Sequence, residues 1–508
     1  MLKLADIFGN HMVLQRDKKI AIFGSAAPKT DVYVSFRGVE EHTSSDMSGK
    51  WICYLSPQSV GSGDDLIVTD NDQRICIEDV AVGDIFFAGG QSNMEYYMKF
   101  DAEYSQEEAQ IDTLNTNIRF YDVPKVSWDG ELNDYDYSAY GKWRILSREN
   151  LPFYSAVSYY FLKQLYAELK IPLAVVCCSF GGSNSSAWLP KEDIYEAGGG
   201  IWWECYEEGL KSIKNLDFEI AAYKKYPRSN PAKKLFDPDN ARMMFPGFSK
   251  EEQQELVKNN KVQRRALLPC DPWRPAGLYH YMVQPLIPFT FKGILWYQGE
   301  SDSAHPEVYE GMFRQNIHRL RRDFGTELSV LFVQLAPFGQ WLNSTGTQYP
   351  ILRAAQERVA NQMPNTWMAT SGDVGMEWDI HPKHKRKIGE RLCLLALGHI
   401  YEKQLLCDAP IKEQCNRYRN ELHVRFKYAD GLHIEGEHLN GLKVFVHHES
   451  IEPENIAICG DELILFFVDL PQENIDLEFA QTPFFDVNLY NGTNIPAVPF
   501  KDVISKGT

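Results

Sequence analysis

The middle of the chain alternates apolar runs of five to seven residues with longer segments of helical periodicity, and this alternation limits the fold more than any other feature. Apolar runs of this kind are typical of parallel strands that are buried on both faces by helices. We therefore expect an α/β domain, a parallel sheet covered by helices, over residues 81–405. The clearest strands are expected at 171–180, 291–299 and 328–337, and the clearest helices at 155–170, 308–324, 351–363 and 384–403.

Both ends of the chain show a different pattern. Residues 1–80 contain short β-rich runs bounded by Pro, Gly, Asp and Asn, which predict a small β-sandwich. Strand signals return over 406–508 and predict a second β-rich module. Residues 190–275 are rich in charge, Trp and Tyr, and we expect a partly helical excursion there, either a lid over a cleft or an extension of the surface. Several domains are the normal expectation for 508 residues.

Charge and cysteine content exclude several classes of protein. The formal charge is −17, from 69 acidic and 52 basic residues, and no Lys/Arg block offers a nucleic-acid surface. No apolar run reaches 18 residues and residues 1–30 lack the core of a signal peptide, so we expect no membrane partner and a cytoplasmic protein, or a secreted one if a leader was removed. The ten cysteines form no CxxC pair, which predicts reduced, mostly buried thiols and no zinc ribbon.

The stretch FFAGGQSNMEYYM, residues 86–98, places Ser92 directly after an apolar run that ends in two glycines. Glycine permits a sharp turn, which can lift the Ser92 hydroxyl out of the carboxyl edge of the sheet, where open α/β sheets bind ligands. The G-x-S-x-G elbow of α/β-hydrolases is not met, because Met94 stands at its last position. The alternative is that Ser92 only caps the next helix.

Two further polar stretches follow the same logic. In WYQGESD, residues 296–302, several polar side chains follow a second strong strand, although such a turn can also be an ordinary helix start. In WDIHPKHKRKIGERL, His381 stands before Pro382 and a long helical segment, close to the positive end of the helix dipole, which favours neutral imidazole. Asp379 could orient that ring, as a general base requires. We expect Ser92 and His381 at one exposed sheet edge.

A metal site at His381 and His384 is disfavoured. The HExxH spacing is absent, and the neighbouring cations would repel a metal ion. These cations are Lys383, Lys385, Arg386 and Lys387. We expect no metal and no cofactor.

Six blocks of the sequence, in this order, resemble the sialate O-acetylesterase family of carbohydrate esterases, which belongs to the SGNH hydrolases with their flavodoxin-like sheet. They are HMVLQRDKKIAIFGSA, DVAVGDIFFAGGQSNME, CCSFGGSNSSAWLP, GLYHYMVQPLIPFTFKGILWYQGESD, LRAAQE and WDIHPKHKRKIGERL. The closing NLYNGTNIPAVPF also resembles the family's usual tail.

The resemblance implies a role for each candidate residue. Ser92 would attack the acetyl carbonyl, and His381 would take its proton and return it to the departing sugar hydroxyl. The oxyanion hole would consist of the backbone N–H groups of Ser92 and Gly182 and the amide of Gln298. Supporting positions would be Gln91, Asn93 and Glu300.

The orienting aspartate departs from the common SGNH pattern. That pattern has Asp three residues before His, but position 378 is Trp, so the candidate is Asp379. Glu300 and Asp373 are alternative orienters, and a Ser-His dyad aided by a backbone carbonyl is a third arrangement.

The substrate class that the resemblance implies is an acetylated mono- or oligosaccharide, either an acetylated sialic acid or a hemicellulose fragment of xylan or xyloglucan type. Candidate sugar platforms are Trp188, Trp202, Trp203 and Trp341, although such rings are more often core. The sequence leaves the oligomeric state open, a homodimer included. Three rival functions are a carboxylate-pair glycosidase using GESD and EWD, a non-catalytic carbohydrate-binding protein, and a serine peptidase or lipase.

Overall fold

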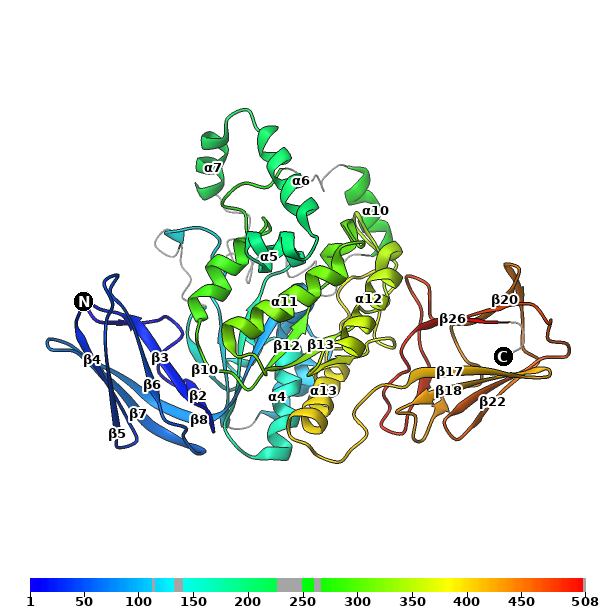
Figure 1. Cartoon of the computed structure of the whole chain (residues 1–508), viewed down its shortest axis with the longest axis horizontal. Helices are drawn as coiled ribbons and strands as arrows, with labels where there is room; N and C mark the ends of the chain where they lie inside the picture. The colour runs from blue at the N-terminus through cyan, green and yellow to red at the C-terminus, as the bar shows by residue number, and fades with distance from the viewer. Residues whose placement is uncertain (112–114, 132–139, 226–248, 260–265, 506–508) are drawn as a thin grey trace. The chain divides into compact units, whose positions relative to one another are not determined.

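The computed structural model describes residues 1–111, 115–131, 140–225, 249–259 and 266–505 (Figure 1). Its internal contacts divide the chain into two compact units. The first unit comprises residues 1–247, 263–330 and 363–365, and the second comprises 248–262, 331–362 and 366–508. No helix in the described part of the chain is long and apolar enough to cross a bilayer.

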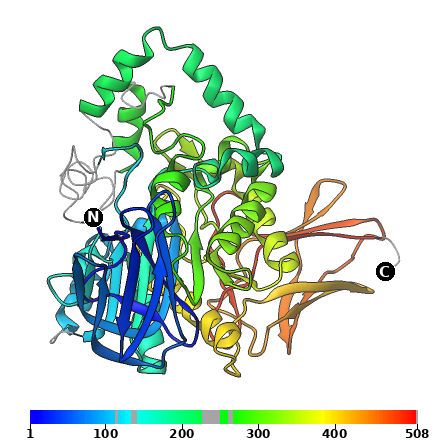
Figure 2. The ribbon, with the colours of Figure 1, turned by 60° about the vertical axis from the view of Figure 1, so that its left-hand side comes forward.

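The first unit begins with a β-rich module, as the sequence predicts. One antiparallel sheet is formed by β1 (Lys3–Leu4), β3 (Ile20–Ser25) and β6 (Lys50–Leu55). Four further strands belong to a second sheet. They are β2 (Val13–Gln15), β4 (Asp31–Phe36), β5 (Val39–Ser44) and β7 (Gly61–Thr69). Figure 2 brings these blue strands to the front. Buried and exposed residues alternate along β4, the pattern of a sheet with one face packed inward.

One strand connects this module to the central sheet. β8 (Arg74–Gly90) spans 17 residues. Its first part pairs with β7 and β2, and its last part pairs in parallel with β11 (Leu173–Ser179) and β12 (Gly293–Tyr297). The boundary that we expected between residues 80 and 81 therefore falls inside a single strand, because the two sheets share it.

The central sheet of the first unit has the order β10-β9-β11-β8-β12, with β9 at Asn115–Asp122 and β10 at Trp143–Leu146. β9, β11, β8 and β12 are parallel and β10 is antiparallel, so the sheet is mixed. Every residue of β11 and β12 is buried, which confirms the strands predicted at 171–180 and 291–299.

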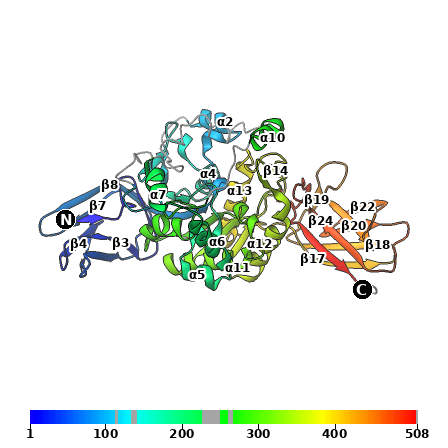
Figure 3. The ribbon, with the colours of Figure 1, turned by 90° about the horizontal axis from the view of Figure 1, so that it is seen from above.

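Helices cover this sheet. α4 (Ala156–Leu169) and α11 (Tyr309–Phe324) confirm the helices predicted at 155–170 and 308–324. Figure 3 draws α4 apart from α5, α6 and α11, as expected for helices on two faces of one sheet. The remaining α-helices described in this unit are α1 (Ser92–Glu95), α2 (Tyr104–Gln110), α5 (Lys191–Glu196), α6 (Gly200–Lys211) and α7 (Leu216–Lys225).

The excursion predicted at 190–275 is partly helical. It supplies α5, α6 and α7 to the first unit and α10 (Lys250–Lys258) to the second. Residues 226–248 and 260–265 lie outside the described residues, and the lid stays a prediction.

The second unit contains strand and helix segments of the predicted α/β region. β13 (Ser329–Val333), whose last three residues belong to this unit, and β16 (Thr366–Ala369) are neighbours in one sheet. α12 (Tyr349–Gln362) confirms the helix predicted at 351–363. The helix expected at 384–403 is shorter. α13 (Arg386–Leu395) passes directly into a π-helix, η8 (Ala396–Ile400).

A β-sandwich closes the second unit, as the sequence predicts. One sheet has the order β17 (Ile411–Tyr418), β18 (Glu421–Lys427), β23 (Glu462–Phe466), β22 (Asn455–Cys459). The other has the order β21 (Glu449–Ile451), β20 (Leu442–Val446), β24 (Ile475–Phe479), β26 (Phe500–Ile504). Both sheets contribute buried apolar side chains to one core, such as Val424 from β18 and Leu477 from β24. Two further sheets have two short strands each. One pairs β14 (Gln340–Trp341) with β15 (Ser344–Thr345), and the other pairs β19 (His433–Ile434) with β25 (Leu489–Tyr490).

Candidate active site

The turn that follows β8 is held at the carboxyl edge of the central sheet. Gly90 has a φ of +136°, and a Cβ at this position would lie 2.0 Å from the carbonyl oxygen of Tyr297. The N–H of Gln91 donates to that same carbonyl at 3.0 Å, and the N–H of Phe180 donates to the Gly90 carbonyl at 3.0 Å. The turn is thus pinned between the ends of β11 and β12, and it confirms the sharp glycine turn that the sequence predicts.

Ser92 is the first residue of α1 and is half-buried. The residue that caps this helix is Gln91, so the alternative that Ser92 is a helix cap is wrong. Within the described parts of the chain, the Ser92 hydroxyl has no hydrogen-bond partner. Its oxygen is therefore available to a ligand.

The two amides beside Ser92 anchor it to the segment after β12. The Oε1 atom of Gln91 accepts from the backbone N–H groups of Gly299 (3.2 Å) and Ser301 (3.3 Å). The Nδ2 atom of Asn93 donates to Oε1 of Glu300 at 2.5 Å. The structure thus brings together the three supporting residues of the sequence prediction, Gln91, Asn93 and Glu300, and their contacts fix the turn that carries Ser92.

The glycine pair after β11 lies beside Ser92. A Cβ on Gly181 would lie 3.4 Å from Cβ of Ser92. The Gly181 N–H donates to Oε2 of Glu95 at 2.6 Å, whereas the Gly182 N–H, at a residue with a φ of +75°, has no acceptor among the described residues. Gly182 is therefore the glycine of this pair whose N–H can serve a ligand.

Sequence reasoning missed Glu95, which holds this glycine loop. Besides accepting from Gly181, its carboxylate lies 3.6 Å from Nζ of Lys125, and that buried ammonium also donates to the Ser179 carbonyl. A usable signal was its position one helical turn after Ser92, because residues three apart lie on one helix face.

Gln298 is buried, and its amide nitrogen has protein acceptors. Nε2 lies 2.5 Å from Oδ2 of Asp302 and 3.2 Å from the Ser183 carbonyl. Gln298 can donate to an oxyanion only by giving up one of these bonds, and its predicted role in the oxyanion hole stays a prediction. Burial raises the pKa of Asp302 to about 6, against the opposing effect of hydrogen bonds from Ser185 and Gln298.

His381 belongs to the second unit, in the loop that precedes α13. The helix begins five residues later, at Arg386, so His381 lies before this helix as the sequence indicates, and an effect of the helix dipole on the ring stays a prediction. The residue is only 4% exposed, which corrects the expectation of an exposed edge. Burial lowers the pKa of His381 and thus favours the neutral imidazole of a general base.

Asp379 lies beside this ring. Its Oδ1 is 3.4 Å from Nδ1 of His381, slightly beyond the usual N–H···O distance, and accepts the His381 backbone N–H at 2.8 Å. Its Oδ2 lies 2.9 Å from Nζ of Lys383. Burial alone would raise the pKa of Asp379, but interactions with His381 and Lys383 bring it below the ordinary value. The Trp341 ring packs edge-on against His381, with centroids 5.2 Å apart.

The two rival orienters have other partners. Asp373 accepts two hydrogen bonds from Arg391, at 2.7 and 2.8 Å, and lies 2.8 Å from Nζ of Lys387. Glu300 accepts from Asn93, as described above. Asp379 is therefore the best-supported orienter. Ser92 and His381 lie in different units, and their meeting stays a prediction.

The four tryptophans proposed as sugar platforms differ in their surroundings. Trp188 is 2% exposed, packs edge-on against Trp296 and donates to Ser183 Oγ, so it is core and cannot present a face to a sugar. Trp202 packs edge-on against a histidine ring, and the Trp203 ring lies under the ammonium of Lys191. Trp202, Trp203 and Trp341 are partly exposed, and their role as platforms stays a prediction.

Comparison with known proteins finds carbohydrate acetylesterases. The family model "Carbohydrate esterase, sialic acid-specific acetylesterase" matches residues 271–397. The sialate O-acetylesterase of Mus musculus is 25% identical over 470 residues, and that of Rattus norvegicus is 26% identical over 473, each covering 85% of this chain and 80% of the relative. A carbohydrate acetylesterase from Xanthomonas citri has the same fold, with a TM-score of 0.75, 24% identity and 99% of both chains covered. The chain is therefore similar to sialate O-acetylesterases over most of its length, and residues 271–397 match the model of that carbohydrate esterase family.

Proposed function

We propose that this chain is a carbohydrate O-acetylesterase that removes acetyl groups from sugar hydroxyls by serine catalysis of the SGNH type. The observation that carries the proposal is the Ser92 hydroxyl, which leaves the carboxyl edge of the central sheet on a turn that requires glycine at position 90 and has no hydrogen-bond partner among the described residues. A hydroxyl held in such a turn by the hydrogen bonds of Gly90, Gln91 and Asn93 is typical of a nucleophile.

Acylation follows from the residues named above. Ser92 Oγ attacks the acetyl carbonyl carbon, and His381, neutral because its pKa is lowered, takes the hydroxyl proton. The tetrahedral oxyanion accepts hydrogen bonds from the N–H groups of Ser92 and Gly182, each donor contributing about 3 kcal/mol. The bond to the sugar oxygen then breaks, the proton passes from His381 to that oxygen, and the acetyl group remains on Ser92.

Deacylation repeats these steps with water. His381 takes a proton from water, the resulting hydroxide attacks the acetyl carbonyl, and the proton returns to Ser92 as acetate leaves. Asp379 stabilises the imidazolium in both halves of the reaction, since its carboxylate lies at the ring and stays ionised at neutral pH.

The substrate that we propose is an acetylated sialic acid or an acetylated hemicellulose oligosaccharide. The mouse and rat relatives are named for sialate esters, which supports the first. A carboxylate-pair glycosidase is less well supported, because Glu300 and Asp302 are already engaged by Asn93, Ser185 and Gln298. A carbohydrate-binding protein would need none of the Ser92 geometry.

The test is acetate release from acetylated sialic acids, xylo-oligosaccharides and xyloglucan fragments, by the wild type and by Ser92→Ala. We expect the variant to lose at least about 10³-fold in kcat, because the nucleophile is removed. The matched control is Ser56→Ala, an exposed serine of β-rich residues 1–80, which should keep full activity. Retention of more than about a hundredth of the rate by Ser92→Ala would refute serine catalysis. Cleavage of glycosidic bonds that Glu300→Gln abolishes would favour the glycosidase.

A further inference from the structure

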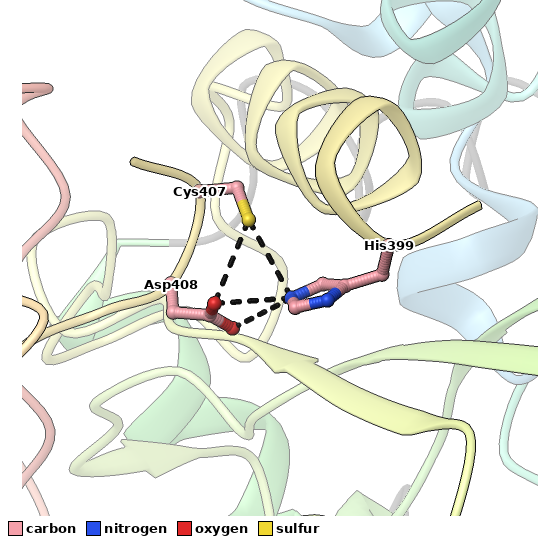
Figure 4. A group of neighbouring side chains, drawn as sticks. All are labelled: His399, Cys407 and Asp408. Carbon is pink, nitrogen blue, oxygen red and sulfur yellow. Dashed lines mark hydrogen bonds and ion pairs between the residues drawn. The ribbon is translucent and has the colours of Figure 1, made fainter. Parts of the chain in front are cut away.

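Three side chains of types that bind metal ions lie close together in the second unit. Along the sequence they are separate from the residues that we assign to catalysis. His399 lies in the π-helix η8, one residue before its end, and Cys407 and Asp408 follow on the segment that leads to β17. Figure 4 shows the three side chains pointing toward one another. Nε2 of His399 lies 3.0 Å from each carboxylate oxygen of Asp408, and Sγ of Cys407 lies 3.5 Å from that nitrogen and 3.5 Å from Oδ2.

We propose that His399, Cys407 and Asp408 bind a zinc ion, with water as the fourth ligand. The ligand set is a thiolate, an imidazole and a carboxylate, which suits zinc and disfavours the hard cations Mg²⁺ and Ca²⁺, whose ligands are oxygens. The site is independent of the proposed esterase activity.

The separations between the ligand atoms fit tetrahedral zinc. With Zn–S near 2.3 Å and Zn–N or Zn–O near 2.0–2.1 Å, tetrahedral geometry places sulfur about 3.6 Å from the other ligands and nitrogen about 3.4 Å from oxygen. The two sulfur distances are both 3.5 Å, and the nitrogen–oxygen distance of 3.0 Å is that of a hydrogen bond, which an ion would replace. Shifts of a few tenths of an ångström complete the site.

Each of the three residues has a further contact, which for Asp408 is made by its main chain. The His399 ring stacks on Trp367, with centroids 4.4 Å apart and planes 12° from parallel. The Asp408 carbonyl accepts from Nδ2 of Asn491 at 3.0 Å. A Cβ on Gly398 would lie 2.4 Å from Sγ of Cys407, so the glycine is what lets the thiol approach the end of the helix. Ligands fixed in this way lose little entropy when a metal binds.

The cluster is sheltered but not sealed. Cys407 is buried, whereas the side chains of His399 and Asp408 are 24% and 19% exposed. An ion can therefore enter from solvent and keep one water ligand. On binding, zinc displaces the thiol proton of Cys407, which leaves as H⁺, and no bond in the chain breaks. The bound ion would tie the end of η8 to the segment that leads to β17.

The test is titration of the chelator-treated, full-length protein with ZnCl₂ alone, followed by calorimetry and by metal analysis after gel filtration. We expect one zinc per chain, and affinity at least about 10-fold weaker in Cys407→Ser and in His399→Gln. The control is Cys459→Ser, an exposed cysteine of the same unit, which should bind as the wild type does. CoCl₂ in place of zinc should produce a thiolate-to-cobalt charge-transfer band that Cys407→Ser loses.

Two results would overturn the proposal. The first is that the wild-type protein does not bind one zinc per chain in a ten-fold excess of ZnCl₂. The other is wild-type affinity in both Cys407→Ser and His399→Gln. If either variant fails to fold, as judged by circular dichroism, Asp408→Asn takes its place under the same criterion.

Discussion

The turn around Ser92 and the loop around His381 are built in different ways. Ser92 is positioned by main-chain contacts at the ends of parallel strands, through Gly90 and the carbonyl of Tyr297. His381 lies in a loop, and what defines it are side chains, Asp379 at the ring and Trp341 against its edge. The position of the serine therefore depends on backbone geometry, and the protonation of the histidine depends on neighbouring charges. This difference can be tested from both sides.

The largest effect expected is that of His381→Ala. The variant loses the base that takes the proton of Ser92, so kcat for acetate release should fall by about 10³-fold or more while the fold is retained. Steady-state kinetics on the best substrate of the panel measure it. His384→Ala, an exposed histidine of the same loop, should be nearly silent. Equal losses in the two variants would contradict the assignment of the base.

Gly90→Ala tests the backbone side of the comparison. A Cβ would meet the Tyr297 carbonyl oxygen at 2.0 Å, and a φ of +136° strains any residue with a side chain. We expect the free energy of unfolding to fall by about 3 kcal/mol or more, measured by urea denaturation. The control is Gly9→Ala, where a Cβ's nearest neighbour is 3.7 Å away. An unchanged stability for Gly90→Ala would show that the turn is not constrained.

Asp379→Asn tests how the ring is held. The amide keeps the shape of the side chain but not the charge that stabilises the imidazolium, so kcat should fall by about 10–100-fold, less than for His381→Ala. Asp373→Asn is the comparison variant, because its carboxylate binds Arg391 and Lys387. A larger loss of kcat in folded Asp373→Asn than in Asp379→Asn would make Asp373 the orienter.

The smallest effect expected is a shift of the pH profile. His381 must be neutral to act as a base, so kcat/KM should fall as pH drops through its lowered pKa. The positive charge of Lys383 contributes to that lowering, after burial, and Lys383→Met should move the acidic limb to higher pH. Lys387→Met, an exposed lysine paired with Asp373, should leave the limb in place. A shift of the acidic limb to lower pH in Lys383→Met would contradict this role of Lys383.

Elements with a strong local signal could be predicted from the sequence. The strands β11 and β12 and the helices α4 and α11 lie within a few residues of their expected ranges, because long apolar runs and helical periodicity are properties of the segment itself. The turn at Ser92 was equally accessible, since glycine is needed where φ is positive.

Features that depend on distant partners could not be predicted. The continuity of β8 across residue 80 arises from pairing with strands on both sides of the expected boundary. The burial of His381 and Trp188 depends on packing that a linear pattern does not encode. The start of α13 at Arg386 was missed because a run of basic residues has no apolar periodicity to mark where the first turn begins.

The shared strand β8 has a consequence for how this enzyme can be altered. Its residues 74–83 pair with the N-terminal module, and its residues 84–90 form the middle of the central sheet and end two residues before Ser92. Cutting the chain at residue 80 would sever a hydrogen-bonded ribbon, not a linker. The N-terminal module thus supports the strand that leads to Ser92, and an exchange of this module between related proteins would have to join the two sequences within β8 itself.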